Sequence, residues 1–211
     1  MTLRALDLFC GAGGASMGLH RAGFDVIGVD HRPQPRYPFV FVQGDALRPP
    51  VRLEDFDLIW ASPPCQAYIR SGTVNKDRAP RLIKPVRAML KAAGAPFVIE
   101  NVPGAPIRPD VRLCGSQFGL AVRRHRAFET SWRAFSLMAP CDHSKPAVGV
   151  YGNPHGKRGA WPGMLPSDLG TWSRAMGIDW MDASEIAQAI PPVYAEYIAR
   201  AFLEQHRRAA A

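Results

Sequence analysis

FDLIWASPPCQ, residues 56–66, joins an apolar run to a rigid loop that carries a cysteine. Nearly every residue from 56 to 61 is apolar, as expected for a parallel strand buried on both faces of a sheet. Pro63 and Pro64 would end such a strand, because proline donates no N–H and fixes its own φ. Cys65 then lies beyond the carboxyl end of a buried strand, where open α/β sheets bind their ligands. Cys65 is therefore a candidate nucleophile, with a small buried apolar residue as the alternative.

The composition indicates one globular domain with a basic surface. The 211 residues include 26 Lys and Arg against 18 Asp and Glu, and the net charge of +8 favours a polyanionic partner. No apolar run approaches the ~20 residues that span a bilayer, and the first residues lack the h-region of a signal peptide. The four cysteines are scattered without a C-x-x-C pair, which is typical of a reducing compartment. We therefore expect a cytoplasmic protein with no membrane partner.

A second unit of strand and loop lies at the start of the chain. Residues 4–9 indicate a strand that runs into CGAGG at 10–14, followed by a helix from about Ala15 to Ala22 that Gly23 ends. A glycine-rich turn between strand and helix lets the backbone approach a nucleotide closely. The spacing differs from G-x-G-x-x-G, so a tight turn that needs only its glycines is the alternative.

Acidic residues follow the next two predicted strands. Residues 24–30 indicate a strand that ends in Asp30, where nucleotide-binding α/β folds place an acid against the ribose hydroxyls. Residues 39–42 indicate a short strand, and Asp45 follows it. Because the ends of parallel strands share one edge of a sheet, Phe9, Asp30 and Asp45 predict one nucleoside site. The alternative for Asp30 is an exposed acid at the end of a strand.

A further buried strand, at 95–99, leads into Glu100-Asn101-Val102. An acid that emerges from so apolar a strand is partly desolvated, which raises its pKa and makes it a proton donor near neutral pH. The alternative is an acid that caps the following turn. Before this strand, apolar residues at helical spacing predict a helix at 82–93 that Gly94 ends, and residues 67–80 form a polar, basic loop that we expect to be a mobile lid.

Two arginines precede the next predicted strand, at about 127–132. Arg124 and Arg126 point the same way if the chain is extended, as two planar donors for one anion or carbonyl, with a solvated basic face as the alternative. Residues 135–184 then lose regular periodicity and are rich in Gly, Pro, Trp, His and basic residues, which is typical of a loop-based nucleic-acid reader or of a long connection. Pro191-Pro192 opens a last helix, whose apolar face we expect to pack on the sheet.

The tripeptide Cys141-Asp142-His143 raises the question of a zinc site. Cys114 and His155 offer further zinc ligands elsewhere in the chain. Their spacing matches no standard pair of zinc ligands. The sequence therefore predicts no metal site, with a metal bound by Cys141 and His143 as the alternative.

Taken together, these motifs resemble those of the cytosine-5 DNA methyltransferases, most closely the short forms found in phages. The resemblance covers nearly the whole chain, and the order of its motifs is collinear; Pro-Pro-Cys-Gln followed by Glu-Asn-Val is the most specific pair. The matching blocks are Asp7–Gly14, Asp30, Gly44-Asp45, Pro63–Gln66, Glu100–Val102, Arg123–Arg126 and Ala189–Pro192. The resemblance implies an α/β, Rossmann-like methyltransferase sheet with a catalytic domain at 1–134 and 185–211. It also implies a small, irregular target-recognition region at 135–184.

The resemblance implies S-adenosylmethionine as the cofactor. Phe9 would lie against the adenine, Asp30 would bind the ribose, and Asp45 would accept a hydrogen bond from the adenine amino group. The family usually has Gly-Asn where this chain has Ala187-Gln188, and the Gln188 side chain keeps an amide. The other cofactor-binding residues that the resemblance implies are Gly11, Gly13, Gly14 and Pro63.

The resemblance also implies methyl transfer to C5 of a cytosine that has flipped out of double-stranded DNA. Cys65 as a thiolate would add to C6, and protonated Glu100 would donate to N3. Arg124 and Arg126 would steady the cytosine carbonyl and a nearby phosphate. Because a free thiol has a pKa near ~8.5, local positive charge or loss of a proton on base binding must assist Cys65. The implied substrate-binding residues are Ser62, Pro64, Gln66, Asn101 and Val102.

Two other functions are alternatives: the same chemistry on RNA such as tRNA, and a catalytically idle homologue that binds DNA. The presence of Cys65, Glu100 and the two arginines argues against the idle homologue. The recognition region has about 50 residues, less than half the usual length in the family. This implies a short or relaxed target sequence, or help from a second copy or a helper subunit. The setting implied is a phage or a restriction–modification system in a bacterial or phage-infected cell.

Overall fold

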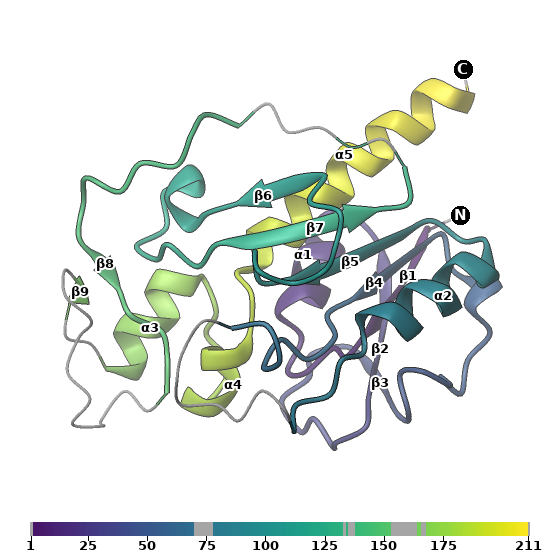
Figure 1. Ribbon diagram of the computed structural model, residues 1–211, viewed down its shortest axis with the longest axis horizontal. Helices are drawn as coiled ribbons and strands as arrows, with labels where there is room; N and C mark the ends of the chain where they lie inside the picture. Colours follow the sequence, from purple (N-terminus) through teal and green to yellow (C-terminus); the bar gives the residue numbers. More distant parts are fainter. Residues whose placement is uncertain are drawn as a thin grey trace.

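The computed structural model describes residues 2–69, 78–132, 134, 138–152, 164–165 and 168–210. It has a central sheet with helices on both faces and a smaller region, containing α3, α4 and β8, beside it (Figure 1). The expected lid at 67–80 and the basic, glycine-rich segment at 149–159 fall partly outside the described residues.

Seven strands form one mixed sheet in the order β3-β2-β1-β4-β5-β7-β6. β1 to β5 run parallel, whereas β7 pairs antiparallel with both β5 and β6. All four residues of β4 are buried, as its continuous apolar run predicts. The predicted α/β, Rossmann-like sheet is confirmed. The strands are β1 (Arg4–Leu8), β2 (Asp25–Asp30), β3 (Val40–Gln43), β4 (Leu58–Ala61), β5 (Phe97–Asn101), β6 (Val111–Leu113) and β7 (Arg126–Thr130).

Three helices cover the two faces of the sheet. The helices of the chain are α1 (Gly14–Arg21), α2 (Ile83–Ala93), α3 (Leu169–Met176), α4 (Ala183–Gln188) and α5 (Pro192–Ala210), with short 3-10 turns η1 (Leu53–Asp55) and η2 (Gly115–Phe118). α1 and α5 share one hydrophobic core with Phe128, and α2 shares another with Ile99 on the opposite face (Figure 1). Gly18 lets α1 and α5 touch, because a Cβ there would lie 2.1 Å from the carbonyl oxygen of Pro192.

The signals that end and begin helices act as the sequence predicts. Gly23 and Gly94 follow α1 and α2 with φ of +104° and +73°, a conformation that glycine adopts without strain. Pro192 occupies the first turn of α5, where a missing N–H costs no hydrogen bond. In the part of the chain that the structure describes, no helix combines the length and the apolar character that crossing a membrane requires.

The region at 135–184 is more regular than its composition indicates. Its described part includes α3, the start of α4 and the short parallel pair β8 (Ala147–Val148) and β9 (Met164–Leu165). Asp168 caps α3 by accepting the N–H of Thr171 at 2.7 Å, and Asp182 caps α4 in a capping box with Glu185. The expectation of an irregular region therefore needs correction for these two helices. The expected boundary between 184 and 185 falls inside α4, and the division into domains stays a prediction.

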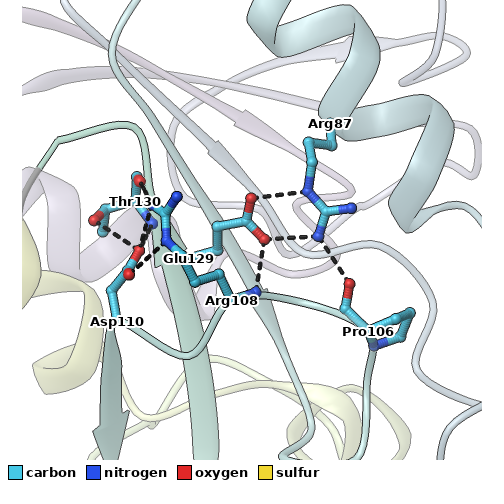
Figure 2. A network of polar contacts seen from close by, with 6 residues as sticks. All are labelled: Arg87, Pro106, Arg108, Asp110, Glu129 and Thr130. Carbon is cyan, nitrogen blue, oxygen red and sulfur yellow. Dashed lines mark hydrogen bonds and ion pairs between the residues drawn. The ribbon is translucent and has the colours of Figure 1, made fainter.

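A buried carboxylate fixes β7 to α2 and to the loop before β6 (Figure 2). Arg87, on α2, donates from Nε and one terminal nitrogen to the two oxygens of Glu129 at 2.8 and 2.7 Å. The same guanidinium donates to the carbonyl of Pro106 at 2.8 Å, and the N–H of Arg108 donates to Glu129 at 3.0 Å. Glu129 is 4% exposed, so these bonds replace the water that the carboxylate loses on burial.

The electrostatic balance at Glu129 favours its charged form. Burial alone would raise the pKa of this carboxyl, but the hydrogen bonds from Arg87 and the Arg108 N–H outweigh it and hold the pKa below its ordinary value of 4.5. A carboxyl with a lowered pKa in the folded state stabilises the fold above its unfolded pKa, and this contribution is lost as the pH falls through the folded pKa.

We expect Glu129→Ala to lower the free energy of unfolding by about 2–3 kcal/mol at pH 7, because Arg87 keeps its charge but loses its anionic partner. The loss should shrink as the pH falls below 4.5 and through the lower pKa of the folded carboxyl, below which wild-type Glu129 is protonated as well. Urea unfolding at several pH values measures both effects. Arg52→Ala is the matched control, because Arg52 makes an exposed ion pair of 4.0 Å with Glu54 and should contribute little. Equal losses for the two variants would contradict the buried pair as the cause.

Candidate functional site

The parallel order of β1 to β5 brings the predicted site residues to one edge of the sheet. Phe9 and the glycine turn follow β1, Asp30 ends β2, Asp45 follows β3, and Cys65 follows β4. Glu100 lies in β5, one residue before its end. This edge, at the carboxyl ends of the strands, is where open α/β sheets bind ligands.

The loop that carries Cys65 is tied to its neighbours through the backbone. The side chain of Asn101 donates from Nδ2 to the carbonyl of Pro63 at 2.8 Å, and its Oδ1 accepts the N–H of Val102 at 3.0 Å. The N–H of Ser62 donates to the carbonyl of Leu8 at 3.1 Å. Asn101 is fully buried, so it holds the loop in place. The sequence predicted a substrate contact for Asn101 and missed this function.

Around Cys65, the expected substrate residues differ in exposure. Ser62, Pro64 and Val102 are half-buried and Gln66 is exposed. The N–H of Tyr68 closes the turn by donating to the carbonyl of Cys65 at 2.8 Å. The turn therefore presents the side chains on either side of Cys65 at the surface of the strand edge.

Glu100 is a buried acid with a cationic partner. It is 6% exposed, and Oε1 lies 2.9 Å from Nε of Arg126. The hydroxyl of Ser62 also hydrogen-bonds to it. Burial raises the pKa of Glu100, and Arg126 and Ser62 oppose this only in part, so the pKa stays above its ordinary value. The direction of this shift agrees with the sequence prediction of a proton donor near neutral pH.

Cys65 is half-buried, and the pKa of its thiol is raised. Burial raises the pKa of this thiol; Arg126 lowers it, but the charge of Glu100 raises it again. The net shift is upward, so the thiol is neutral at pH 7 in the protein without ligands. Local positive charge is therefore insufficient by itself to form the thiolate that a nucleophile requires.

Arg124 and Arg126 do not form the pair of parallel donors that an extended chain would give. The backbone at Arg124 has a φ of +31°, so the chain is not extended there. Arg124 is 3% exposed, and its guanidinium donates to the carbonyls of Val150 at 3.0 Å and Ala187 at 2.7 Å. Burial lowers the pKa of Arg124 to about 10, which leaves it charged at neutral pH. Arg126 pairs with Glu100, whereas Arg124 holds backbone of the region beside the sheet.

The glycine turn combines unusual backbone angles with close packing. Phe9, Gly11 and Gly13 have φ of +60°, +50° and +88°, so the turn requires left-handed conformations at three positions. Gly14 serves packing, because a Cβ there would lie 2.7 Å from the carbonyl oxygen of Ile190. The alternative of a tight turn that needs its glycines agrees with the left-handed Gly11 and Gly13, whereas Gly14 is required for packing against Ile190. A Cβ at Gly11 would meet no atom within 4 Å, which leaves its side of the turn open.

The two acids expected to bind the cofactor have different surroundings. Asp30 is buried, and its carboxylate accepts the N–H groups of Gly11 and Arg32, each at 3.1 Å. It therefore ties the glycine turn to the end of β2. Asp45 is exposed and accepts only the N–H of Leu47 at 2.9 Å among the contacts described for its side chain.

The side chains at this edge of the sheet fit a nucleoside. A half-buried aromatic ring at Phe9, a carboxylate at Asp30 with lone pairs to spare, and an exposed carboxylate at Asp45 can receive a base and ribose hydroxyls. The open side of Gly11 provides the close approach to the backbone. The ligand contacts of these residues remain predictions, as do those of Gly13, Gly14 and Pro63.

Other residues near the turn were not anticipated from the sequence. The indole N–H of Trp180 donates to the carbonyl of Ala12 at 2.8 Å, and Arg36 pairs with Asp182 and Glu185, each at 3.0 Å. These contacts join the segment around α4 to the glycine turn and to the loop after β2. Gln188, expected to bind the cofactor, is exposed and donates to Ser184 in its own helix at 3.1 Å.

A buried chain of hydroxyls and one carboxylate lies below the glycine turn. Tyr37 donates to Ser16 at 2.8 Å, and Ser16 donates to Asp7. Burial raises the pKa of Asp7 to about 7, and one of its oxygens has no partner among the described residues. Asp7 lies within an otherwise apolar strand, and this position was the feature of the sequence that could have indicated a buried polar network.

Comparisons with known proteins identify relatives of this chain. The sequence profile described as C-5 cytosine-specific DNA methylase matches residues 3–108, half of the chain. The type II methyltransferase M.XorII of Xanthomonas oryzae is 31% identical over 121 residues, which are 48% of this chain and 28% of M.XorII. M.AquIA of Picosynechococcus is 28% identical over 124 residues, 49% of this chain and 50% of M.AquIA. The matched part thus spans at most half the length of these curated relatives.

Solved structures share the fold over almost the whole chain. A prophage-encoded protein from E. coli, described as a candidate DNA modification methyltransferase, has a TM-score of 0.67 at 16% identity and covers 98% of this chain and 100% of its own. The Dnmt2 methyltransferase of S. pombe has a TM-score of 0.62 at 14% identity and covers 97% and 99%. At these identities the likeness establishes the methyltransferase fold.

The family profile spans the glycine turn, the loop with Cys65 and the strand with Glu100, which are the parts of the chain that form the edge described above. The chain therefore belongs to the C-5 cytosine-specific DNA methylase family, with S-adenosylmethionine as its cofactor.

Proposed function

We propose that this protein transfers a methyl group to C5 of a cytosine flipped out of double-stranded DNA, through a transient bond between Cys65 and C6 of the base. The observation that carries the proposal is the grouping of Cys65 with the ion pair of Glu100 and Arg126 at the carboxyl ends of β4 and β5. Nucleophile, proton donor and cation thus belong to one electrostatic unit.

In the proposed reaction the sulfur of Cys65 bonds to C6 while Glu100 gives a proton to N3. Electron density then moves to C5, which becomes nucleophilic. Bound S-adenosylmethionine supplies the electrophilic methyl group. C5 would take the methyl group and leave S-adenosylhomocysteine, and N3 would return its proton to Glu100. Transfer of the C5 proton to solvent and departure of the Cys65 thiolate would then restore the C5–C6 double bond, so that every bond made to the protein is broken again.

The pKa directions suggest how the thiol is activated. The carboxylate of Glu100 raises the pKa of Cys65, and Arg126 lowers it. When Glu100 is protonated and faces N3 of the base, its charge no longer opposes the thiolate, whereas the charge of Arg126 remains. We infer that base binding and thiolate formation support each other through these three residues.

For Arg124 we propose a positioning function in place of the direct contact implied by the resemblance. Both terminal nitrogens are engaged by Val150 and Ala187. The hydroxyl of Tyr194, on α5, donates to the carbonyl of Arg124 at 3.1 Å. Arg124 therefore couples the region at 135–184 to the strand that bears Arg126. The region at 135–184 would read a short or relaxed target sequence, alone or with a second chain. A phage or restriction–modification setting stays a prediction, as does a cytoplasmic location.

Cys65→Ala should abolish methyl transfer, by at least ~1000-fold, while cofactor binding and folding change little, because the half-buried thiol is needed only for the covalent step. Transfer of a radiolabelled methyl group and calorimetric binding of S-adenosylmethionine measure the two properties. Duplex DNA with 5-fluorocytosine should trap a covalent complex with the wild-type protein, and the same duplex with ordinary cytosine is the control. Residual transfer by the variant near the wild-type rate would rule out the thiol as nucleophile.

Arg126→Gln should lower the free energy of unfolding by about 2–3 kcal/mol at pH 8 and by less at pH 5. Without Arg126 the pKa of Glu100 rises further above 4.5, and stability linked to a raised carboxyl pKa is lost as the pH rises through it. Chemical unfolding across this pH range provides the measurement. In the background of Glu100→Gln the effect of Arg126→Gln should lose its pH dependence, and a persistent dependence would contradict the assigned pair.

Incubation of mixed-sequence duplex DNA with the protein and S-adenosylmethionine, followed by base-resolution mapping, should show 5-methylcytosine within a short or relaxed sequence. RNA of matched sequence should be methylated far less, since the proposal takes DNA as the substrate. The catalytic variant Cys65→Ala serves as the blank. Strong preference for RNA would replace the proposed substrate, and no product from a protein that binds the cofactor would favour the idle homologue.

A further inference from the structure

Four side chains with metal-binding atoms converge where β6 ends and β7 begins, at the same edge of the sheet as Cys65 but beyond β5 in the strand order. They are Cys114, His125, Cys141 and His143, and their ligand atoms all lie within 4.8 Å of one another. Cys114 is buried and the other three are exposed. The sequence predicted no metal because the spacing of Cys141 and His143 matches no standard pair of zinc ligands. His155, the other ligand considered there, lies outside the described residues.

The sheet itself brings the first two side chains together. The antiparallel register pairs Leu113 with Arg126, so Cys114 and His125 are the next residues outward on the two strands. The N–H of Gly115 donates to the carbonyl of Arg123 at 2.9 Å and continues the pairing beyond them. The positions of Cys114 and His125 are therefore fixed by backbone bonds.

Two side chains from the same hairpin hold the segment that supplies the other pair. Gln117 donates from Nε2 to the carbonyl of Ala139 at 2.7 Å, and Arg123 donates to the carbonyl of His143 at 3.1 Å. Asp142 accepts the N–H of Ser144 at 2.8 Å and forms a tight turn between them. Cys141 and His143 thus approach the hairpin on a braced loop.

The distances suit a tetrahedral site. Sγ of Cys114 lies 3.4 Å from Nε2 of His143, and Sγ of Cys141 lies 3.6 Å from Nε2 of His125. A Zn²⁺ ion with bonds of ~2.3 Å to sulfur and ~2.05 Å to nitrogen places such atoms about 3.6 Å apart. Two separate thiol–imidazole hydrogen bonds would explain each distance, but they give no reason for both pairs to meet at one point.

We propose that Cys114, His125, Cys141 and His143 bind one structural Zn²⁺ ion. Two thiolates and two imidazoles match the ligand preference of zinc, and four protein ligands leave no position for substrate. The ion would join the hairpin to the first part of the region at 135–184. His125 stands between Arg124 and Arg126, so the same ion would brace the backbone that carries both arginines.

Metal content tests the proposal without relying on methyl transfer. The full chain, purified in a non-chelating reductant from zinc-supplemented cells, should contain about one zinc per chain. Cys141→Ser with His143→Asn should reduce this at least ~10-fold, and both residues are exposed, so the fold should survive. Cys65→Ser and His20→Gln are the matched controls and should keep the zinc.

Two further readouts address the same four side chains. Cobalt substituted for zinc should give the visible absorption of tetrahedral Co²⁺ bound to thiolates, and the double variant should not. Alkylation of the exposed Cys141 should be slow with zinc and fast after removal of zinc with a chelator, which should also lower the melting temperature. Absence of zinc from folded wild-type protein from zinc-supplemented cells would overturn the proposal, whether the two thiols are free or Cys114 and Cys141 form a disulfide. Equal zinc contents of the wild type and the double variant would overturn it as well.

Discussion

The antiparallel pairing of β7 with β5 is the constraint on which the rest of the site depends. Its register sets Phe128 opposite Glu100, and Arg126, two residues earlier on the same face of β7, reaches the carboxylate of Glu100. On the other face, Glu129 is held by Arg87. A shift of one residue in the β5–β7 register would move the side chains of β7 to the opposite faces of the sheet. Such a shift would break both the Arg126–Glu100 pair and the Arg87–Glu129 pair, so the two pairs together fix the register.

Much of the fold could be predicted because its signals are local. The apolar runs and the glycines and prolines that end them lie within a few residues of the elements they define, and the parallel order of strands gathers Asp30, Cys65 and Glu100 at one edge. The helix caps Asp168 and Asp182 were equally local but stand in a stretch rich in glycine and proline, which masked them. In that stretch the Gly- and Pro-rich composition favoured irregular structure, although the spacing of the capping residues indicates helices.

What the sequence could not provide depends on contacts between distant residues. The extended conformation expected at Arg124 fails because its guanidinium is bound by carbonyls that lie 26 and 63 residues further along the chain. The function of Asn101 depends on Pro63, and that of Gly14 on Ile190. The four residues of the proposed zinc site likewise come from three separate segments, so no spacing along the chain indicates that they meet.

These distant contacts also bear on the proposal that the small region at 135–184 reads the target. Trp180 binds the backbone of the glycine turn, Arg36 binds α4, and Arg124 binds both Val150 and Ala187. The core around Trp172 includes Ala12 from the glycine turn, so the region and the cofactor edge share buried side chains. Under the proposed function, the described part of this region, packed on the sheet in this way, would lose little conformational entropy on binding DNA. In the proposed function, the described part of the region would thus hold its target contacts in a fixed relation to the thiol and to the cofactor site.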